Sequence, residues 1–416
     1  MNFLFVTTYD LKMNSSASLR NSSLINGLIN VGMQVDLLTS ESIEEHARFD
    51  ESFNLCENNL GEKYYIKYNN KLKSFISTKN EFKTNNTLKN NVKLFLKKIY
   101  KKFSVIDPGK MNVKNVDELR IDLSKYDCII SSSDPKSSHL IVKRLLNNCK
   151  QIKKPIWIQY WGDPLALDIT HQSLIPFFYL KKIEYDILKN ADKIIYVSPL
   201  TLEEQKNEYP KLKEKMFFLP IPYYKERIYK NNNKIKEKYW VSYIGSYHSK
   251  YRNILPLYNS FNNTKNLKLS IVGDSDLSLH SKENIEVIPR LSLKETEKYE
   301  EEADLLIVLL NKKGTQIPGK IYHYAGTNKP ILIILDGDRK EEIKEYLSLF
   351  NRFYFCENNE KDILKTIWKI KNTKKEWLPS PYLRSEQIAK QLVKIIDGKE
   401  PIKWTQSWYL EQGQKR

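Results

Sequence analysis

Residues 315–335, TQIPGKIYHYAGTNKPILIIL, predict a loop, a short helix, a turn and a buried strand, in that order. Pro318 and Gly319 should open the helix, because proline has its φ preset for a first turn and glycine lets a ligand approach the backbone. Lys320 then lies in the first turn, among unpaired N–H groups at the positive end of the helix dipole, which suits a phosphate. The apolar run Ile331–Leu335 is typical of a strand buried on both faces. An ordinary αβ unit with a solvated lysine explains the local pattern equally well.

Length and composition favour a globular protein of two domains. The chain has 416 residues, more than one hydrophobic core usually supports, and 41% of them are hydrophobic. We expect no signal peptide and no membrane-spanning segment, because the start lacks a basic region and no apolar run approaches about 20 residues. The four cysteines are scattered without metal-like pairing, which favours reduced thiols in a cytoplasmic protein.

The net charge of +18 is unevenly distributed. Residues 62–125 carry 16 Lys and Arg against 6 Asp and Glu, more than half of the excess. Within them, residues 88–103 (LKNNVKLFLKKIYKKF) place apolar side chains on a rough helical stripe with lysines opposite. This pattern favours a helix lying on an anionic membrane surface, and a basic helix packed on the domain is the alternative. We expect no nucleic-acid partner, because few aromatics are interleaved and no known module is present.

The first 40 residues predict a βαβ unit, and hence a parallel sheet. Its strands are Phe3–Val6 and Gln34–Thr39, with a helix from about residue 19 to 31. The loop after the first strand contains Ser15 and Ser16 in place of the glycines of a dinucleotide fingerprint, so we do not predict NAD binding.

Two aspartates follow later predicted strands of the first half. Asp134 comes after the strand at 127–131, and Asp163 after the strand at 155–160. Ligands of open α/β sheets lie beyond the carboxyl ends of the strands, so we predict that both carboxylates line a ligand site. His171, eight residues after Asp163, is a further candidate. The alternative for Asp163 is a turn-forming Asp-Pro pair.

The second half predicts another phosphate site. The strand Trp240–Ile244 is followed at once by Gly245 and Ser246, and then by Arg252 before a helix. A glycine turn and a basic residue after a strand suit a phosphate, which arginine can hold bidentately.

The segment PGKIYHYAGTNKPIL resembles the donor site of GT-B fold glycosyltransferases, in the large retaining family numbered four. There a Pro-Gly/Ser-Lys turn leads into a Lys-aliphatic-aromatic-Glu-Tyr helix. The resemblance implies that Lys320 meets the donor diphosphate, with Ile321 and Tyr322 beside it. His323 stands where the family has the glutamate that binds the ribose hydroxyls, and an imidazole can also hydrogen-bond a hydroxyl.

The resemblance extends over most of the chain. Together with the strand-end pattern, it leads us to expect three groups of site residues. The donor-binding group is Gly245, Ser246, Arg252, Arg290, Gly319, Lys320, Ile321, Tyr322 and His323. The acceptor-side group is Ser15, Ser16, Arg20 and Asp134. The catalytic group is Asp163 and His171.

The fold implied is α/β, with two Rossmann-like doubly wound domains that face a central cleft and a C-terminal helix that crosses back to the first domain. The expected bounds are 1–222 for the acceptor-side domain, 223–239 for a linker, 240–384 for the donor-binding domain, and 385–416 for the final helix.

The activity implied is that of a bacterial surface-polysaccharide glycosyltransferase. It would move a sugar from a nucleotide-diphosphate donor to a glycan or lipid-linked acceptor, with retention, in the cytoplasm or on the inner face of the membrane. No cofactor is expected beyond the nucleotide sugar as co-substrate. We also expect the enzyme to work without a metal ion, because we identify no Asp-x-Asp pair at a strand end that would hold a divalent ion. A nucleotide-sugar 2-epimerase of the same fold and a basic nucleic-acid-binding protein are the alternatives.

Overall fold

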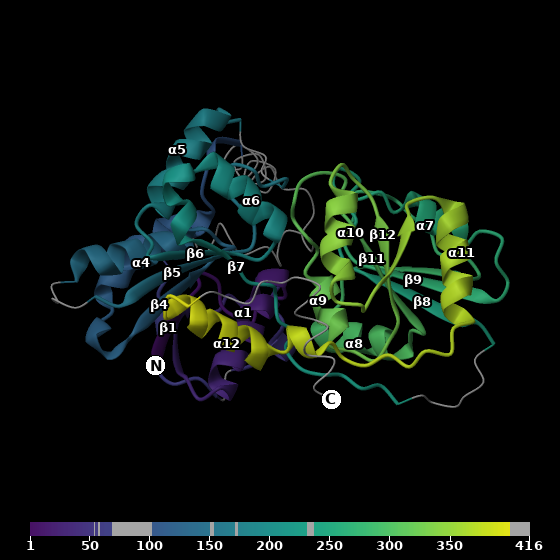
Figure 1. The fold of residues 1–416 in the computed structure, drawn as a ribbon, viewed down its shortest axis with the longest axis horizontal. Coiled ribbons are helices and arrows are strands. Elements are labelled where there is room, and N and C mark those ends of the chain that lie inside the picture. Colours follow the sequence, from purple (N-terminus) through teal and green to yellow (C-terminus); the bar gives the residue numbers. More distant parts are fainter. Residues whose placement is uncertain are drawn as a thin grey trace. The chain divides into compact units, whose positions relative to one another are not determined.

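The computed structural model describes residues 1–53, 55–56, 59–68, 102–149, 154–170, 174–230 and 237–399. The chain divides into two compact units. The first is Met1–Pro220 together with Ile395–Asp397, and the second begins at Ile221. Each unit is built around one parallel sheet (Figure 1).

The sheet of the first unit has the strand order β3-β2-β1-β4-β5-β6-β7. Every strand runs parallel to its described neighbours. The central strands β1 and β4 are buried almost throughout, and the apolar run Phe3–Val6 of β1 is typical of such a strand. The strands are β1 Asn2–Val6, β2 Gln34–Ser40, β3 Lys63–Ile66, β4 Cys128–Ser132, β5 Ile156–Trp161, β6 Lys193–Tyr196 and β7 Met216–Phe218.

Helices cover both faces of this sheet. In Figure 1, α4, α5 and α6 lie on one face and α1 on the other. This follows from the strand order, because right-handed crossovers that leave a sheet in opposite directions place their helices on opposite faces. The helices are α1 Ser16–Asn30, α4 Ser137–Asn148, α5 Phe177–Leu188 and α6 Pro199–Glu208. Shorter 3-10 segments are η1 Glu51–Phe53, η4 Pro108–Glu118, η5 Leu123–Lys125 and η6 Pro210–Lys215.

The second sheet has the order β10-β9-β8-β11-β12-β13, again with parallel neighbours. In Figure 1, α7 and α11 lie on one face of it and α8, α9 and α10 on the other. The strands are β8 Tyr239–Ile244, β9 Leu267–Val272, β10 Ile285–Ile288, β11 Leu305–Leu309, β12 Ile331–Leu335 and β13 Tyr354–Glu357. The helices are α7 Leu255–Ser260, α8 Leu293–Glu302, α9 Lys320–Ala325, α10 Lys340–Ser348, α11 Glu360–Lys371 and α12 Ser385–Ile396, with η7 Pro381–Leu383 before the last.

These two sheets confirm the prediction of two Rossmann-like α/β halves. The opening stretch forms α9 and β12, and β12 is buried at every position. Two short strands were not predicted, β3 and β7. The first lies at the edge of the sheet, in a region whose Asn and Lys content is typical of irregular structure.

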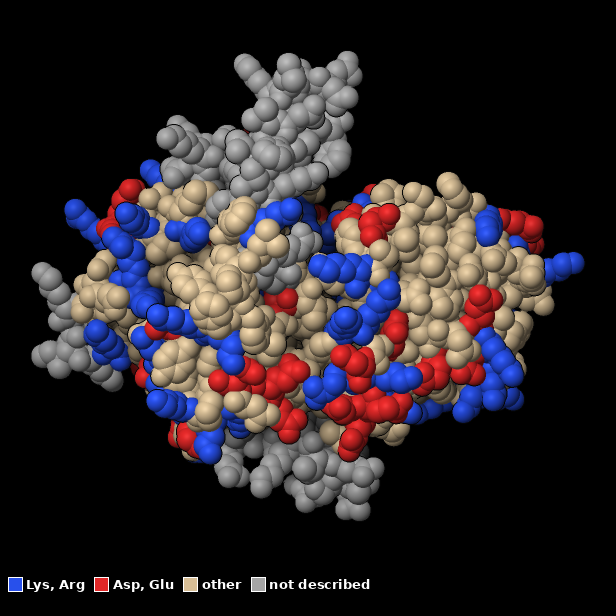
Figure 2. All heavy atoms as spheres, turned by 90° about the horizontal axis from the view of Figure 1, so that it is seen from above, with Lys and Arg blue, Asp and Glu red and all other residues tan. Residues whose placement is uncertain are grey.

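The basic segment at 88–103 lies outside the described residues, apart from Lys102 and Phe103. Among the helices that the structure describes, none has the length and apolar character needed to cross a bilayer. On the face shown in Figure 2, Lys and Arg side chains are widely scattered, with Asp and Glu side chains among them.

Candidate functional site

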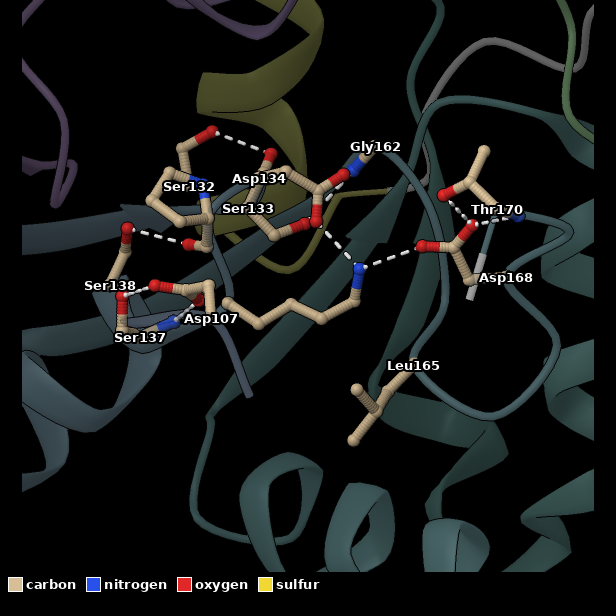
Figure 3. A network of polar contacts seen from close by, with 12 residues as sticks. Asp107, Ser132, Ser133, Asp134, Ser137, Ser138, Gly162, Leu165, Asp168 and Thr170 are labelled. Carbon is tan, nitrogen blue, oxygen red and sulfur yellow. Dashed lines mark hydrogen bonds and ion pairs between the residues drawn. The ribbon is translucent and has the colours of Figure 1, made fainter. Parts of the chain in front are cut away.

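In the first unit, the loops after β1 and β4 are joined by hydrogen bonds. Thr8 donates its backbone N–H to Ser138 Oγ at 2.9 Å, and its hydroxyl lies 2.8 Å from Ser137 Oγ. The Asp107 carboxylate accepts from the backbone N–H of Ser137 at 2.9 Å and from its hydroxyl at 2.6 Å (Figure 3). The strand order reverses between β1 and β4, so these bonds fix the point at which a doubly wound sheet usually binds its ligand.

Lys136 is the centre of a charged cluster at this point. Its Nζ donates to Asp134 Oδ1 at 2.6 Å and to Asp168 Oδ2 at 3.2 Å (Figure 3). The Lys136 side chain is only 9% exposed. Burial opposes the charged ammonium, but the carboxylates of Asp134, Asp168 and Asp163 outweigh it and raise the pKa of Lys136. The lysine therefore stays charged and holds carboxylates from two separate loops.

The carboxyl groups of this cluster titrate differently. Burial, with the charges of Asp134 and Asp168, raises the pKa of Asp163 to about 8, although Lys136 and Arg20 oppose the shift. Burial alone would also raise the pKa of Asp168, but the charge of Lys136 and the hydrogen bonds from Thr170 outweigh burial and lower this pKa. Asp163 can therefore hold or release a proton near neutral pH while its neighbour stays ionised.

Arg20 reaches the same strand ends from α1. It is 5% exposed, donates to Ser132 Oγ at 3.3 Å, and has its guanidinium carbon 5.1 Å from the ring centroid of Tyr160. A Cβ on Gly162 would lie 1.9 Å from Arg20 Nη1, so only glycine leaves room for this side chain.

Of the other predicted residues of the first unit, two lie at the start of α1 and two belong to the cluster around Lys136. Ser15 caps α1, since its Oγ accepts from the N–H of Ser18 at 3.0 Å, and Ser16 is exposed at the first position of the helix. Asp134 and Asp163 follow β4 and β5 and belong to the Lys136 cluster. His171 lies outside the described residues. Sequence reasoning missed Lys136, although its place after the Asp-Pro turn at the end of β4 is a usable signal.

In the second unit, Arg252 joins the loops at the equivalent reversal, between β8 and β11. It donates from Nη1 to the carbonyl of Ser246 at 2.7 Å and from Nε to Asn311 Oδ1 at 3.0 Å. Asn311 in turn donates to the carbonyl of Gln316 at 3.0 Å. Arg252 thus links the turn after β8 to the loop that leads into Pro318 and Lys320.

Gly245 is open on its Cβ side. An added Cβ would have no neighbour nearer than 3.7 Å, and the nearest groups are the Tyr243 hydroxyl and the Arg252 guanidinium. Alanine therefore fits at this position in the unliganded protein, where it would narrow the space above the turn.

The structure corrects the interpretation that no Asp-x-Asp pair follows a strand. Asp274-Ser275-Asp276 follows β9, and Asp336-Gly337-Asp338 follows β12. Asp274 pairs with Arg290 at 2.9 Å, and Asp276 accepts from the N–H and hydroxyl of Ser249 at 2.7 and 2.6 Å. Among the described residues, no group of three or more His, Cys, Asp or Glu side chains is placed to hold a metal ion.

The helix that begins at Lys320 differs from the expectation. It has six residues, and its first N–H groups are not all unpaired. Ile321 donates to the carbonyl of Pro318 at 3.1 Å and Tyr322 to that of Gly319 at 3.2 Å. These short-range bonds tighten the first turn, as is common at helix ends. The side chains of Ile321 and Tyr322 are fully buried, and their backbone N–H groups are engaged in these bonds.

Lys320 and His323 are the polar residues of this helix. Lys320 Nζ lies 3.1 Å from Oε1 of the buried Glu300, a partner that sequence reasoning missed. His323 is 5% exposed, and its Nε2 has no hydrogen-bond partner among the residues that the structure describes. Burial, and then the charges of Lys320 and Arg227, lowers the pKa of His323. The imidazole is therefore neutral and can donate or accept one hydrogen bond.

The chain matches no family model and no curated protein. Among solved structures, Anabaena HepE in complex with UDP and glucose has a TM-score of 0.58 at 10% identity, and the match covers 96% of this chain and 100% of that one. The complex of HepE with UDP-glucose also gives 0.58, at 11% identity and the same coverage. The N-terminal domain of trehalose-6-phosphate phosphatase from Candida albicans gives 0.52 at 9% identity, over 99% of this chain and 96% of that one. These likenesses show the fold, and they confirm the GT-B fold class.

The raised pKa of Asp163 predicts a pH effect on stability. A carboxyl group titrates near pH 4 in an unfolded chain, whereas Asp163 titrates at about 8 when folded. Between these values the folded state alone holds the proton, so rising pH favours unfolding. The free energy of unfolding of wild type should fall relative to Asp163→Asn between about pH 5 and 8, by up to about 1.4 kcal/mol per pH unit.

Urea denaturation of both proteins across this range measures the difference. Asp117→Asn is the matched control, because its hydrogen bonds with Arg144 lower the pKa of Asp117, so that this group stays ionised in both states over the same range and lies outside the Lys136 cluster. Parallel stability curves for wild type and Asp163→Asn would contradict the assigned environment of Asp163.

Proposed function

We propose that the protein is a glycosyltransferase that takes a sugar from a nucleoside-diphosphate donor. The proposal rests on three side chains beside the loops after β8 and β11. They are the cations of Arg252 and Lys320 and the neutral imidazole of His323. Arg252 ties these loops together, and the second of them ends at Lys320, which is followed by His323. Cations at the carboxyl edge of a doubly wound sheet suit a diphosphate. The likeness to HepE, which was solved with UDP and with UDP-glucose, supports the same ligand class.

In this reaction the bond between the anomeric carbon and the diphosphate oxygen breaks, and the acceptor oxygen bonds to that carbon. Negative charge develops on the departing diphosphate, and Lys320 and Arg252 would stabilise it. His323 would bind a ribose hydroxyl. In the first unit, we assign the acceptor to the strand ends beside Arg20 and Asp134. Asp163, with a pKa of about 8, is suited to take up the proton that the acceptor hydroxyl loses.

We further propose transfer with retention and without a bound metal ion. Engagement of Asp274 by Arg290, of Asp276 by Ser249, and of Asp336 by Asn358 at 2.9 Å supports metal independence. A glycan or lipid-linked acceptor in surface-polysaccharide synthesis is the proposed second substrate.

Lys320→Ala tests the donor site. Loss of one group that stabilises developing charge costs about 2 to 4 kcal/mol of transition-state energy, or roughly 30- to 1,000-fold in rate. Release of nucleoside diphosphate should be measured with a panel of nucleotide sugars. Lys329→Ala is the matched control, because Lys329 is another lysine of the same segment, and its Nζ donates to the backbone carbonyl of Glu301 at 2.7 Å.

Near-native turnover by a folded Lys320→Ala variant would show that the donor site is wrongly assigned. Release of a free epimeric sugar without transfer would identify an epimerase instead.

The basic segment supports a further proposal, peripheral binding to the inner face of the membrane. Each lysine near an anionic bilayer contributes roughly 1 kcal/mol, and the effect fades within a Debye length. Replacing the five lysines of the segment by glutamine should therefore release the protein from anionic liposomes in a sedimentation assay, as high salt should for wild type. The lysines are Lys93, Lys97, Lys98, Lys101 and Lys102.

The matched control replaces five exposed lysines in and after α11, which should leave sedimentation unchanged. They are Lys361, Lys365, Lys369, Lys371 and Lys374. Equal sedimentation of wild type and the first variant at low salt, or none by wild type, would refute membrane binding through this segment.

A further inference from the structure

A buried carboxylate stands between two cations in the second unit. Glu300, on α8, is 1% exposed. Its Oε1 pairs with Lys320 Nζ at 3.1 Å, and its Oε2 accepts from Arg227 Nη1. Burial alone would keep a carboxyl group neutral, but Arg227 and Lys320 outweigh it and lower the pKa of Glu300. A buried charge is stable only when it is paired in this way.

Lys320 is held by more than the ion pair. Its Nζ lies 5.3 Å from the ring centroid of Tyr324, one turn along α9, and its side chain is 27% exposed. A lysine has four flexible bonds, and fixing them costs up to about 2 kcal/mol of rotamer entropy. Contacts with Glu300 and Tyr324 meet that cost before any ligand arrives, which is preorganisation.

The backbone of Arg227 is hydrogen-bonded to the residue that follows α9. Its N–H donates to the carbonyl of Gly326, the residue after α9, at 2.9 Å. Two residues on, Tyr229 exchanges hydrogen bonds with the Asn328 side chain at 3.0 and 2.9 Å. Arg227 also lies 3.8 Å from Glu297, a more exposed carboxylate one turn before Glu300. Because Arg227 occupies Oε2, it leaves Oε1 to Lys320.

We infer that Glu300 is a positioning residue that aims Lys320 at the donor diphosphate, and that Arg227 holds Glu300 in place for this task. The inference rests on the proposed function of Lys320. One of the three N–H donors of the ammonium is taken by Glu300, and the phosphate oxygens would take the others. The unpaired Nε2 of His323 supports a ligand here, because burial of a polar nitrogen without a partner is costly.

Glu300→Gln tests the inference, because it keeps the shape and removes the charge. We expect the donor kcat/KM to fall at least tenfold. We also expect Glu300→Gln to cost nothing further in a Lys320→Ala background, since residues that act as a unit are not additive. An additive loss in the double variant would overturn the inference. Glu301→Gln, an exposed neighbour on the same helix, is the control.

A second measurement does not depend on catalysis. Acetylation of Lys320 by limiting acetic anhydride, followed by mass spectrometry, should be several-fold faster in Glu300→Gln and in Arg227→Gln than in wild type. An unchanged rate at Lys320 in Glu300→Gln would overturn the positioning role, whatever the turnover. Faster acetylation in a protein that releases no nucleoside diphosphate from any nucleotide sugar would refute the proposed function and leave the Glu300–Lys320 pairing intact.

Discussion

Crossovers between parallel strands of one sheet are almost always right-handed, and this constraint places the candidate residues of both units. The strand order reverses between β1 and β4 in one sheet and between β8 and β11 in the other. Connections on the two sides of a reversal therefore leave on opposite faces, and their loops separate at the carboxyl edge. Side chains then bridge these loops: Thr8 does so in the first unit, and Arg252 in the second.

The two units carry opposite charge arrangements. In the first unit a buried cation, Lys136, holds Asp134 and Asp168. In the second a buried anion, Glu300, holds Lys320 and Arg227. Each of these buried charges holds side chains from different segments of the chain in place. Under the proposed function this is a division of labour, with a carboxyl group that titrates near neutrality in the first unit and cations suited to a diphosphate in the second.

Much of this could be predicted from the sequence, because strand ends are local features. Apolar runs followed by Gly245, Asp134 or Asp163 mark the carboxyl edges directly. Glu300 and Lys136 were missed because each pairs with a residue that is distant in the sequence. Lys320 meets Glu300 across 20 residues of sequence, and Lys136 meets Asp168 across 32. Such pairs depend on the packing of helices and loops, which no local pattern encodes.

Errors also arose where a local rule was applied too simply. The first turn of α9 was expected to offer unpaired N–H groups, but a six-residue helix closes its first turn on the Pro318 and Gly319 carbonyls. The strand β3 has only four residues and lies at an edge, so its apolar signal is weak beside the surrounding Asn and Lys.

The central claim, that the second unit binds a nucleoside diphosphate, is tested most directly by titration calorimetry. Wild type should be titrated with each common nucleoside diphosphate and with the matching monophosphate. The account predicts that at least one diphosphate binds, and binds more tightly than its monophosphate, because Lys320 and Arg252 would contact the added charge. Gly245→Ala should weaken that binding without lowering stability, since its Cβ meets no protein atom within 3.7 Å. Failure of every diphosphate to bind folded wild type would contradict the account.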